Sequence, residues 1–182
     1  MTIKLFLTST EILPDQHRYL EKLAGKPLTE LTCGLIENAA DSYDDRYEED
    51  SFVNVSHHAL NATGMNISTI DLRTYEGDLS EYEVLWISGG NTFFLRWLIE
   101  EKDFKDKIVS FVESGKVYVW SNAGAIITGP SIQDADTIDD PNYAPVRIDE
   151  GLKITKYVVL PHVNNPDCKN EIAESAKRIL AK

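Results

Sequence analysis

The chain has 182 residues with 42% hydrophobic and 26% charged content, which is ordinary for a globular domain with a sizeable core. Its net charge of −12 argues against nucleic acids and anionic membranes as partners, because both require a basic surface. No apolar run reaches the ~20 residues of a membrane span, and residues 1–15 lack a signal-peptide cleavage site.

Segments typical of strands alternate with segments typical of helices along the chain. Residues 2–9 alternate between apolar and polar, and 14–26 then carry apolar residues at helical spacing. Residues 41–64 open with a dense acidic run, which we interpret as a solvated helix face or helix start. Residues 82–91 begin almost continuously apolar, as in a strand buried on both faces. The other expected strands are 30–41, 65–73, 116–120 and 152–165, and the other expected helices are 92–115, 123–127 and 170–182.

This alternation predicts a doubly wound, mostly parallel α/β sheet with helices on both faces. We expect one α/β domain over 1–182. Functional groups in such sheets gather at the carboxyl ends of strands. Three stretches fall there: Gly89-Gly90-Asn91, Ser121-Asn122, and Pro161-His162-Val163-Asn164.

These stretches together resemble motifs of the peptidase E (aspartyl dipeptidase) family of serine peptidases. "ISGGNTFFL" (87–95) is similar to its Gly-Gly-Asn-Thr motif, "SNAGAI" (121–126) to its Ser-Ala-Gly-Ala elbow, and "LPHVNN" (160–165) to the stretch around its catalytic His. The resemblance extends from "LFLTS" to just beyond His162. It implies a flavodoxin-like, class I glutamine amidotransferase-like fold and a cytoplasmic hydrolase of short peptides, including those with an N-terminal Asp. It implies no cofactor or metal, and a homodimer is left open.

An elbow places one residue on a strained strand-to-helix turn, with N–H groups of the new helix aimed at a developing oxyanion. By the resemblance, the glycine pair supplies the second oxyanion donor. His162 is the expected general base and then acid, since a neutral imidazole accepts a proton at pH 7. The expected oxyanion and substrate-binding residues are Gly89, Gly90, Asn91 and Ala123.

Two residues compete for the tip of this elbow. Counting back from Ala-Gly-Ala places Asn122 at the nucleophile and Trp120 where the family has Gly. An elbow needs small residues at both flanking positions, because strand and helix pack tightly around the turn, so the bulky Trp120 is not expected to fit there. With Ser121 at the tip, the flanking residues are Val119 and Ala123, neither of them Gly. We favour Asn122 because that register needs no slip in the following helix. Asn tolerates positive φ, but its conjugated amide is no nucleophile, so a covalent mechanism would then require Ser121.

The acidic member of the triad is the least defined residue. Family members usually continue into further strands that carry it, whereas this chain stops at "KRILAK", so we expect the acid to be missing or supplied differently. The stretch "DADTIDDPN" (134–142) resembles the family's Asp-bearing segment, although Asp before Pro is also ordinary turn chemistry. The candidates are Asp139 and Asp140, with Asp167 and Glu171 behind them.

Three functional hypotheses follow. The first is an active peptidase E-like serine peptidase using Ser121 and His162, in which a cation from Arg96, Arg147 or Lys156 holds an acidic substrate. The second is a catalytically impaired relative that binds a small peptide or amino acid beside Asn122. The third, a thiol amidotransferase, is set aside, because it needs a Cys at the elbow and the only cysteines lie elsewhere, isolated as in a reducing cytoplasm.

Overall fold

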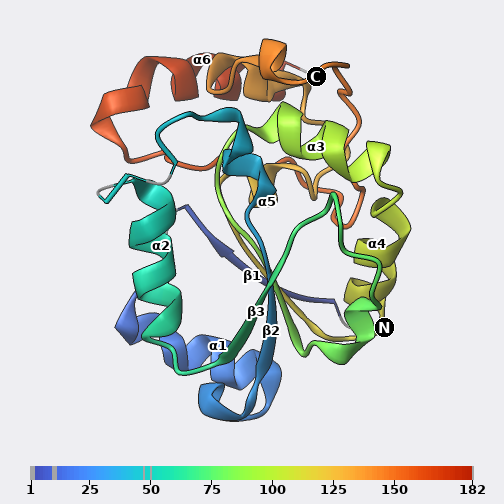
Figure 1. Ribbon diagram of the computed structural model, residues 1–182. Helices are drawn as coiled ribbons and strands as arrows, with labels where there is room; N and C mark the ends of the chain where they lie inside the picture. The colour runs from blue at the N-terminus through green and yellow to red at the C-terminus, as the bar shows by residue number, and fades with distance from the viewer. Residues whose placement is uncertain (1–2, 10–11, 47, 50, 182) are drawn as a thin grey trace.

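A parallel sheet runs through the middle of the protein (Figure 1). The computed structural model describes residues 3–9, 12–46, 48–49 and 51–181. Within them the sheet has five strands in the order β1-β5-β4-β2-β3, and every neighbouring pair is parallel. The strands are β1 (Lys4–Thr8), β2 (Thr32–Ile36), β3 (Asn66–Ile70), β4 (Val84–Ile87) and β5 (Val117–Ser121).

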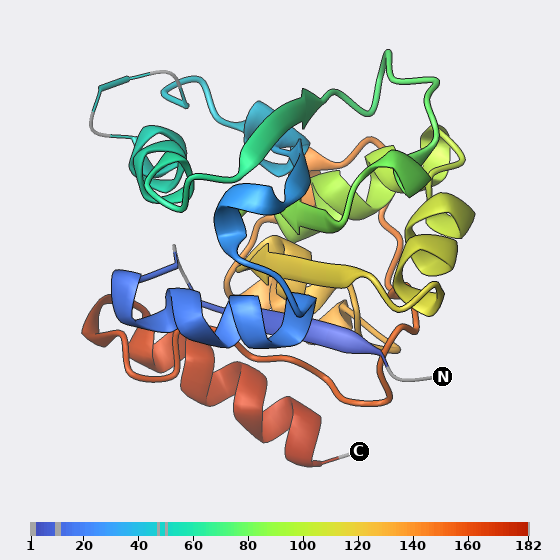
Figure 2. The ribbon, with the colours of Figure 1, turned by 90° about the horizontal axis from the view of Figure 1, so that it is seen from below.

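Helices cover both faces of this sheet, as Figure 2 shows along its edge. On one face α1 and α2 pack through residues such as Leu20 and Leu60, and on the other α3, α4 and α5 pack through residues such as Leu98 and Ile108. The doubly wound α/β fold predicted from the sequence is therefore correct. The helices are α1 (His17–Ala24), α2 (Phe52–Asn61), α3 (Thr92–Glu101), α4 (Lys105–Glu113), α5 (Ala123–Ile126) and α6 (Lys169–Leu180).

Local chemistry sets where several helices begin and end. Ser51 caps α2 by accepting a hydrogen bond from the backbone N–H of Asn54, and Asn91 caps α3 in the same way. Gly25 ends α1 with φ of 79°, a left-handed conformation that costs glycine little. The buried strands β4 and β5 lie inside the sheet, which explains their continuous apolar sequence.

The strand expected over 152–165 is not a strand in the structure. Its first backbone N–H groups bond to the segment after α5 instead: Leu152 donates to the carbonyl of Ile127, and Lys153 donates to that of Gly129. At Gly151 an added Cβ would lie 2.1 Å from the Gly129 oxygen, so the two segments are in close backbone contact. The apolar sequence therefore reflects packing against this segment, and sheet pairing plays no part.

Candidate active site

The predicted elbow is present between β5 and α5. Its intervening residue, Asn122, has φ of 45° and ψ of −109°, a strained conformation that Asn tolerates better than most L-residues. Ser121 is the last residue of β5, pairs with Thr8 in β1 and is 4% exposed. The tip of the turn is therefore Asn122, which agrees with the ungapped register.

The helix after the tip begins at once. The backbone N–H groups of Ala125 and Ile126 both donate to the Asn122 carbonyl, so those of Ala123 and Gly124 precede the helical ladder. Gly124 is required for packing, because a Cβ there would come 2.7 Å from the backbone oxygen of Ile87 in β4. The short helix thus lies directly against the neighbouring strand.

Trp120 occupies the position where a small residue is expected, and the fold accommodates it. Its side chain is fully buried on the face covered by α3–α5, with its ring 4.5 Å from that of Tyr118 in a T-shaped contact. The expectation that a bulky residue would not fit two positions before the tip is wrong, because this side chain enters the core. Its indole nitrogen has no hydrogen-bond partner among the described residues.

The glycine loop after β4 touches the elbow. A Cβ added to Gly89 would lie 3.3 Å from Cβ of Asn122 and 3.7 Å from Oγ of Ser121. Gly90 has φ of 138°, and a Cβ there would come 2.2 Å from the carbonyl carbon of Ala39. These glycines permit close approach of neighbouring segments at the carboxyl edge of the sheet.

Asn91 is fully buried, and its side chain bonds within the protein. Its Oδ1 accepts from the N–H of Phe94, and its Nδ2 donates 2.9 Å to the carbonyl of Asp140. The backbone N–H of Asn91 also donates 2.9 Å to the carbonyl of Ala39. Asn91 therefore holds three segments together at the start of α3.

The two favoured acids lie at the same helix start. Asp139 is buried, and its carboxylate accepts hydrogen bonds from the backbone N–H and the hydroxyl of Thr92. Burial raises the pKa of this carboxyl, and the bonds from Thr92 oppose that shift. Asp140 is exposed and accepts from the backbone N–H of Asn142. The other two candidates lie near α6, Asp167 in the 3-10 helix Pro166–Cys168 and Glu171 exposed in the first turn of α6.

His162 is half-buried and has φ of 61°. Its backbone N–H donates 3.5 Å to Oγ of Ser9, the residue after Thr8 of β1, and both residues line one hollow. Burial lowers the pKa of the imidazole, which is therefore neutral at pH 7. Within the described residues its ring has no hydrogen bond to Ser121, Asn122 or either acid, so His162 shares the edge with the elbow without a bonded triad.

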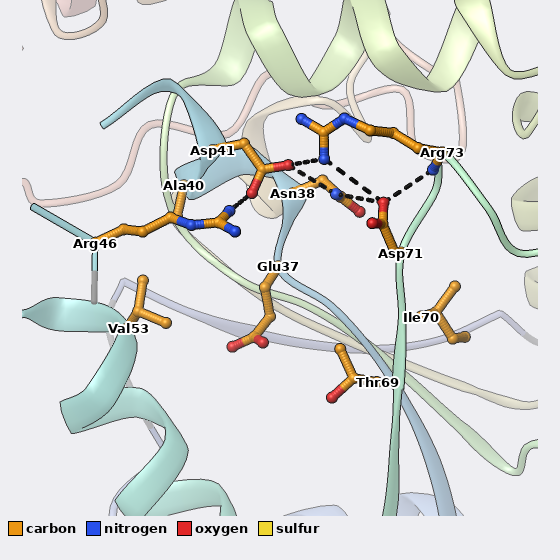
Figure 3. Close-up of a pocket in the computed structure, with 10 residues that line it drawn as sticks. All are labelled: Glu37, Asn38, Ala40, Asp41, Arg46, Val53, Thr69, Ile70, Asp71 and Arg73. Carbon is orange, nitrogen blue, oxygen red and sulfur yellow. Dashed lines mark hydrogen bonds and ion pairs between the residues drawn. The ribbon is translucent and has the colours of Figure 1, made fainter. Parts of the chain in front are cut away.

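A polar pocket at the ends of β2 and β3 was missed from the sequence (Figure 3). The Asp41 side chain is 6% exposed and forms ion pairs with both Arg46 and Arg73. Glu37 pairs with His57, and burial raises the pKa of its carboxyl. The acidic run therefore starts as a buried ion-pair cluster, and α2 begins only at Phe52, after the run. The one available signal was the presence of Arg46 within that run.

The cations expected to hold an acidic substrate are largely engaged elsewhere. Arg96 is 2% exposed, donates to the carbonyl of Glu150 and pairs with Glu100 at 2.8 Å. Arg147 pairs with Asp136 and Asp149. Lys156 lies over the ring of Tyr157.

Both cysteines are free, and neither lies at the elbow. Cys33 is buried in β2, and burial raises the pKa of its thiol to about 12. Within the described residues no group of three or more His, Cys, Asp or Glu side chains is arranged to hold a metal ion. The helices described are all too short or too polar to cross a membrane.

A parallel sheet of five described strands with helices on both faces, and with a strand-turn-helix elbow against a glycine loop, defines a doubly wound α/β protein. The model of peptidase family S51 matches residues 6–181, and the chain belongs to this family. The resemblance seen in the sequence is thereby confirmed.

Known proteins related to this chain carry matching descriptions. Peptidase E of Haemophilus influenzae is 30% identical over 170 residues, which cover 93% of this chain and 72% of the relative. An uncharacterized peptidase of Listeria innocua is 28% identical over 170 residues, covering 88% of this chain and 77% of the relative. A crystal structure from Listeria monocytogenes, provisionally assigned to peptidase E, superposes with a TM-score of 0.80 at 26% identity, covering 97% of this chain and 88% of that one.

Proposed function

We propose that this member of peptidase family S51 binds short peptides at the carboxyl edge of its sheet and lacks the covalent step of a serine peptidase at its elbow. The observation that carries the proposal is the backbone of Asn122, which occupies the strained tip between β5 and α5. A carboxamide is no nucleophile, because its nitrogen lone pair is conjugated with the carbonyl. The same amide offers a hydrogen-bond donor and acceptor to a bound peptide.

The lack of a hydrogen-bond partner for the His162 ring within the described residues supports the proposal that the covalent step is absent. A general base acts on a hydroxyl within hydrogen-bond reach, and the His162 ring has no such partner among the described residues. The glycine loop and the N–H groups at the start of α5 remain suited to a peptide carbonyl. Loss of the nucleophile alone removes most of the rate enhancement of a triad while leaving substrate binding.

A second candidate is an active serine peptidase that uses Ser121 and cleaves short peptides, including those with an N-terminal Asp. One observation favours it: Oγ of Ser121 faces Gly89, the expected oxyanion residue. Against it, Ser121 is 4% exposed at the end of a paired strand, so its hydroxyl would have to turn outward.

Labelling with a fluorophosphonate probe separates the two candidates. We expect no adduct on the natural protein. Asn122→Ser tests whether a hydroxyl at the tip restores labelling, with Asn122→Ala as the control that lacks a hydroxyl. Dipeptide hydrolysis is followed in the same three proteins, and peptide binding is measured by calorimetry. An adduct on the natural protein that disappears in Ser121→Ala would overturn the binding proposal in favour of the peptidase.

A further inference from the structure

Two aromatic rings form an open corner beside the glycine loop. The rings of Tyr43 and Phe52 are nearly perpendicular, at 85°, with centroids 6.1 Å apart. The ring of Tyr143 makes a second edge contact with Tyr43, at 68° and 5.6 Å. Phe52 is 43% exposed and Tyr143 46% exposed, so the corner is accessible from solvent.

The hollow at this corner is lined by carboxylates as well as rings. Its lining residues are Tyr43, Asp45, Glu48, Ser51 and Phe52, a set that contains no lysine or arginine. Within the described part of the chain, neither Asp45 nor Glu48 takes part in an ion pair. Ring faces carry negative electrostatic potential, so ring and carboxylate both favour a positively charged group here.

The corner is attached to the proposed peptide site through a ring contact and a hydrogen bond. The Tyr43 ring contacts that of Tyr143, and Asn91, which follows the two glycines, donates to the carbonyl of Asp140. Tyr143 lies three residues beyond Asp140, in the 3-10 helix Pro141–Tyr143. The aromatic corner and the elbow therefore flank the same glycine loop, since Gly89 contacts Asn122.

We propose that the corner between Tyr43 and Phe52 is a subsite for the ammonium group of a short peptide, held against the rings and beside Asp45 and Glu48. This inference rests on the proposed peptide-binding function and names the charge of the preferred ligand. Arg96 and Arg147 point the same way, because Arg96 is buried beside Glu100 and Arg147 already pairs with two carboxylates of the chain, Asp136 and Asp149. The net charge of −12 attracts cations and repels acidic peptides over longer range.

The ammonium group can come from the peptide N-terminus or from a lysine side chain. Calorimetry at low salt with three peptides distinguishes these two sources. Alanyl-alanine carries only the α-ammonium, N-acetyl-alanyl-lysine carries only the ε-ammonium, and N-acetyl-alanyl-norleucine carries neither. We expect one of the first two to bind at least tenfold more tightly than the norleucine peptide. Equal affinity for all three peptides overturns the subsite.

Matched variants locate the binding. Phe52→Leu preserves apolar volume at the start of α2 and should weaken the preferred peptide about two- to fivefold, as expected for loss of one exposed cation–π contact. The double variant Asp45→Asn, Glu48→Gln should weaken it further and reduce its salt dependence. Tyr157→Leu and Glu113→Gln, exposed changes elsewhere, should leave the affinity unchanged. Unchanged affinity in Phe52→Leu and in the double variant overturns the proposal.

Tetramethylammonium chloride distinguishes failure of this inference from failure of the proposed function. The cation alone should shift the NMR signals of Phe52 whether or not any peptide binds. A shift without peptide binding supports the corner and contradicts the peptide function. Peptide binding that is insensitive to Phe52→Leu, with no shift by the cation, supports the function and overturns the corner.

Discussion

Gly89 and Asn122 lie so close that a methyl group on residue 89 would come 3.3 Å from Cβ of Asn122. The glycine loop and the elbow tip therefore pack as one unit, although 33 residues separate them in the chain. The position of each segment depends on the other, so substitutions at residue 89 or 122 can test the contact.

The loss of folding stability caused by three Gly→Ala substitutions should depend on how closely the new Cβ approaches neighbouring atoms. Gly89→Ala should cost about 1–3 kcal/mol, because it crowds the elbow tip. Gly90→Ala should cost more, since its Cβ would overlap the backbone of Ala39 and its φ is also positive. Gly115→Ala is the control, with positive φ and open space around it, and should cost about 1–2 kcal/mol. Urea unfolding measures the ranking, and equal losses at residues 90 and 115 would contradict the contact with Ala39.

The strained backbone of Asn122 should affect the free energy of unfolding of variants at this position. Asn122→Gly should be at least as stable as the natural protein, because glycine adopts positive φ freely. Asn122→Ala should be less stable than Asn122→Gly by about 1–3 kcal/mol, since φ of 45° with ψ of −109° is strained for any residue with a Cβ. Ser121→Ala and Ser121→Gly supply the control, and there the order reverses, because Ser121 is in a strand. The same order at both positions would contradict the assignment of the tip to Asn122.

Asp139 should make stability depend on pH. Burial raises its folded-state pKa, so its carboxyl stabilises the fold fully below the unfolded-state pKa, and that contribution is lost as pH rises through the folded-state value. Asp139→Asn keeps an oxygen that accepts from Thr92 and removes the buried charge, so its stability relative to the natural protein should improve between pH 4 and pH 7. Asp139→Ala leaves the Thr92 donors without that acceptor and should cost about 1–3 kcal/mol at pH 4, and less at pH 7, because it also removes the buried charge. Chemical denaturation at the two pH values measures both effects.

The pH dependence of stability expected from His162 has the opposite sign to that expected from Asp139. Burial lowers its folded-state pKa below 6.5, so its contribution is complete above that pH and is lost as pH falls through the lowered value. His162→Asn, which tolerates the φ of 61°, should therefore lose less stability than the natural protein on going from pH 7.5 to pH 5. NMR titration of the ring protons gives the pKa directly. A value at or above 6.5 would mean that a carboxylate partner faces the ring.

The parts of the fold with strong local signals were predictable. The strands β1 to β5 lie within segments expected to be strands, and β4 and β5 in particular are apolar runs that end in small residues. Counting back from Ala123-Gly124-Ala125 places the turn at Asn122. The segment 152–165 was misassigned, because its apolar pattern is the same whether it pairs in a sheet or packs against residues 127–129. Periodicity alone cannot separate those two outcomes.

The polar chemistry of the edge was less predictable, because it depends on contacts between distant segments. Asp41 pairs with Arg73, and Asn91 bonds to Asp140, across separations that no local pattern encodes. Tyr43 lies inside a run dominated by acidic residues, so its ring contacts with Phe52 and Tyr143 could not be predicted from the local pattern. The expectation that Trp120 would not fit was wrong because its side chain points into the core between the sheet and α3–α5, and that direction depends on where β5 lies in the sheet.

The strand order also determines when the edge described above can first exist during synthesis. The hydroxyl of Thr8 bonds to the carbonyl of Trp120, a separation of 112 residues, because β5 is the sheet neighbour of β1. Among the described strands, β1 therefore has no sheet partner until the ribosome has passed the elbow, whereas β2, β3 and β4 have theirs earlier. Such late, long-range pairing slows folding and leaves an apolar segment open to aggregation or chaperone binding in the growing chain.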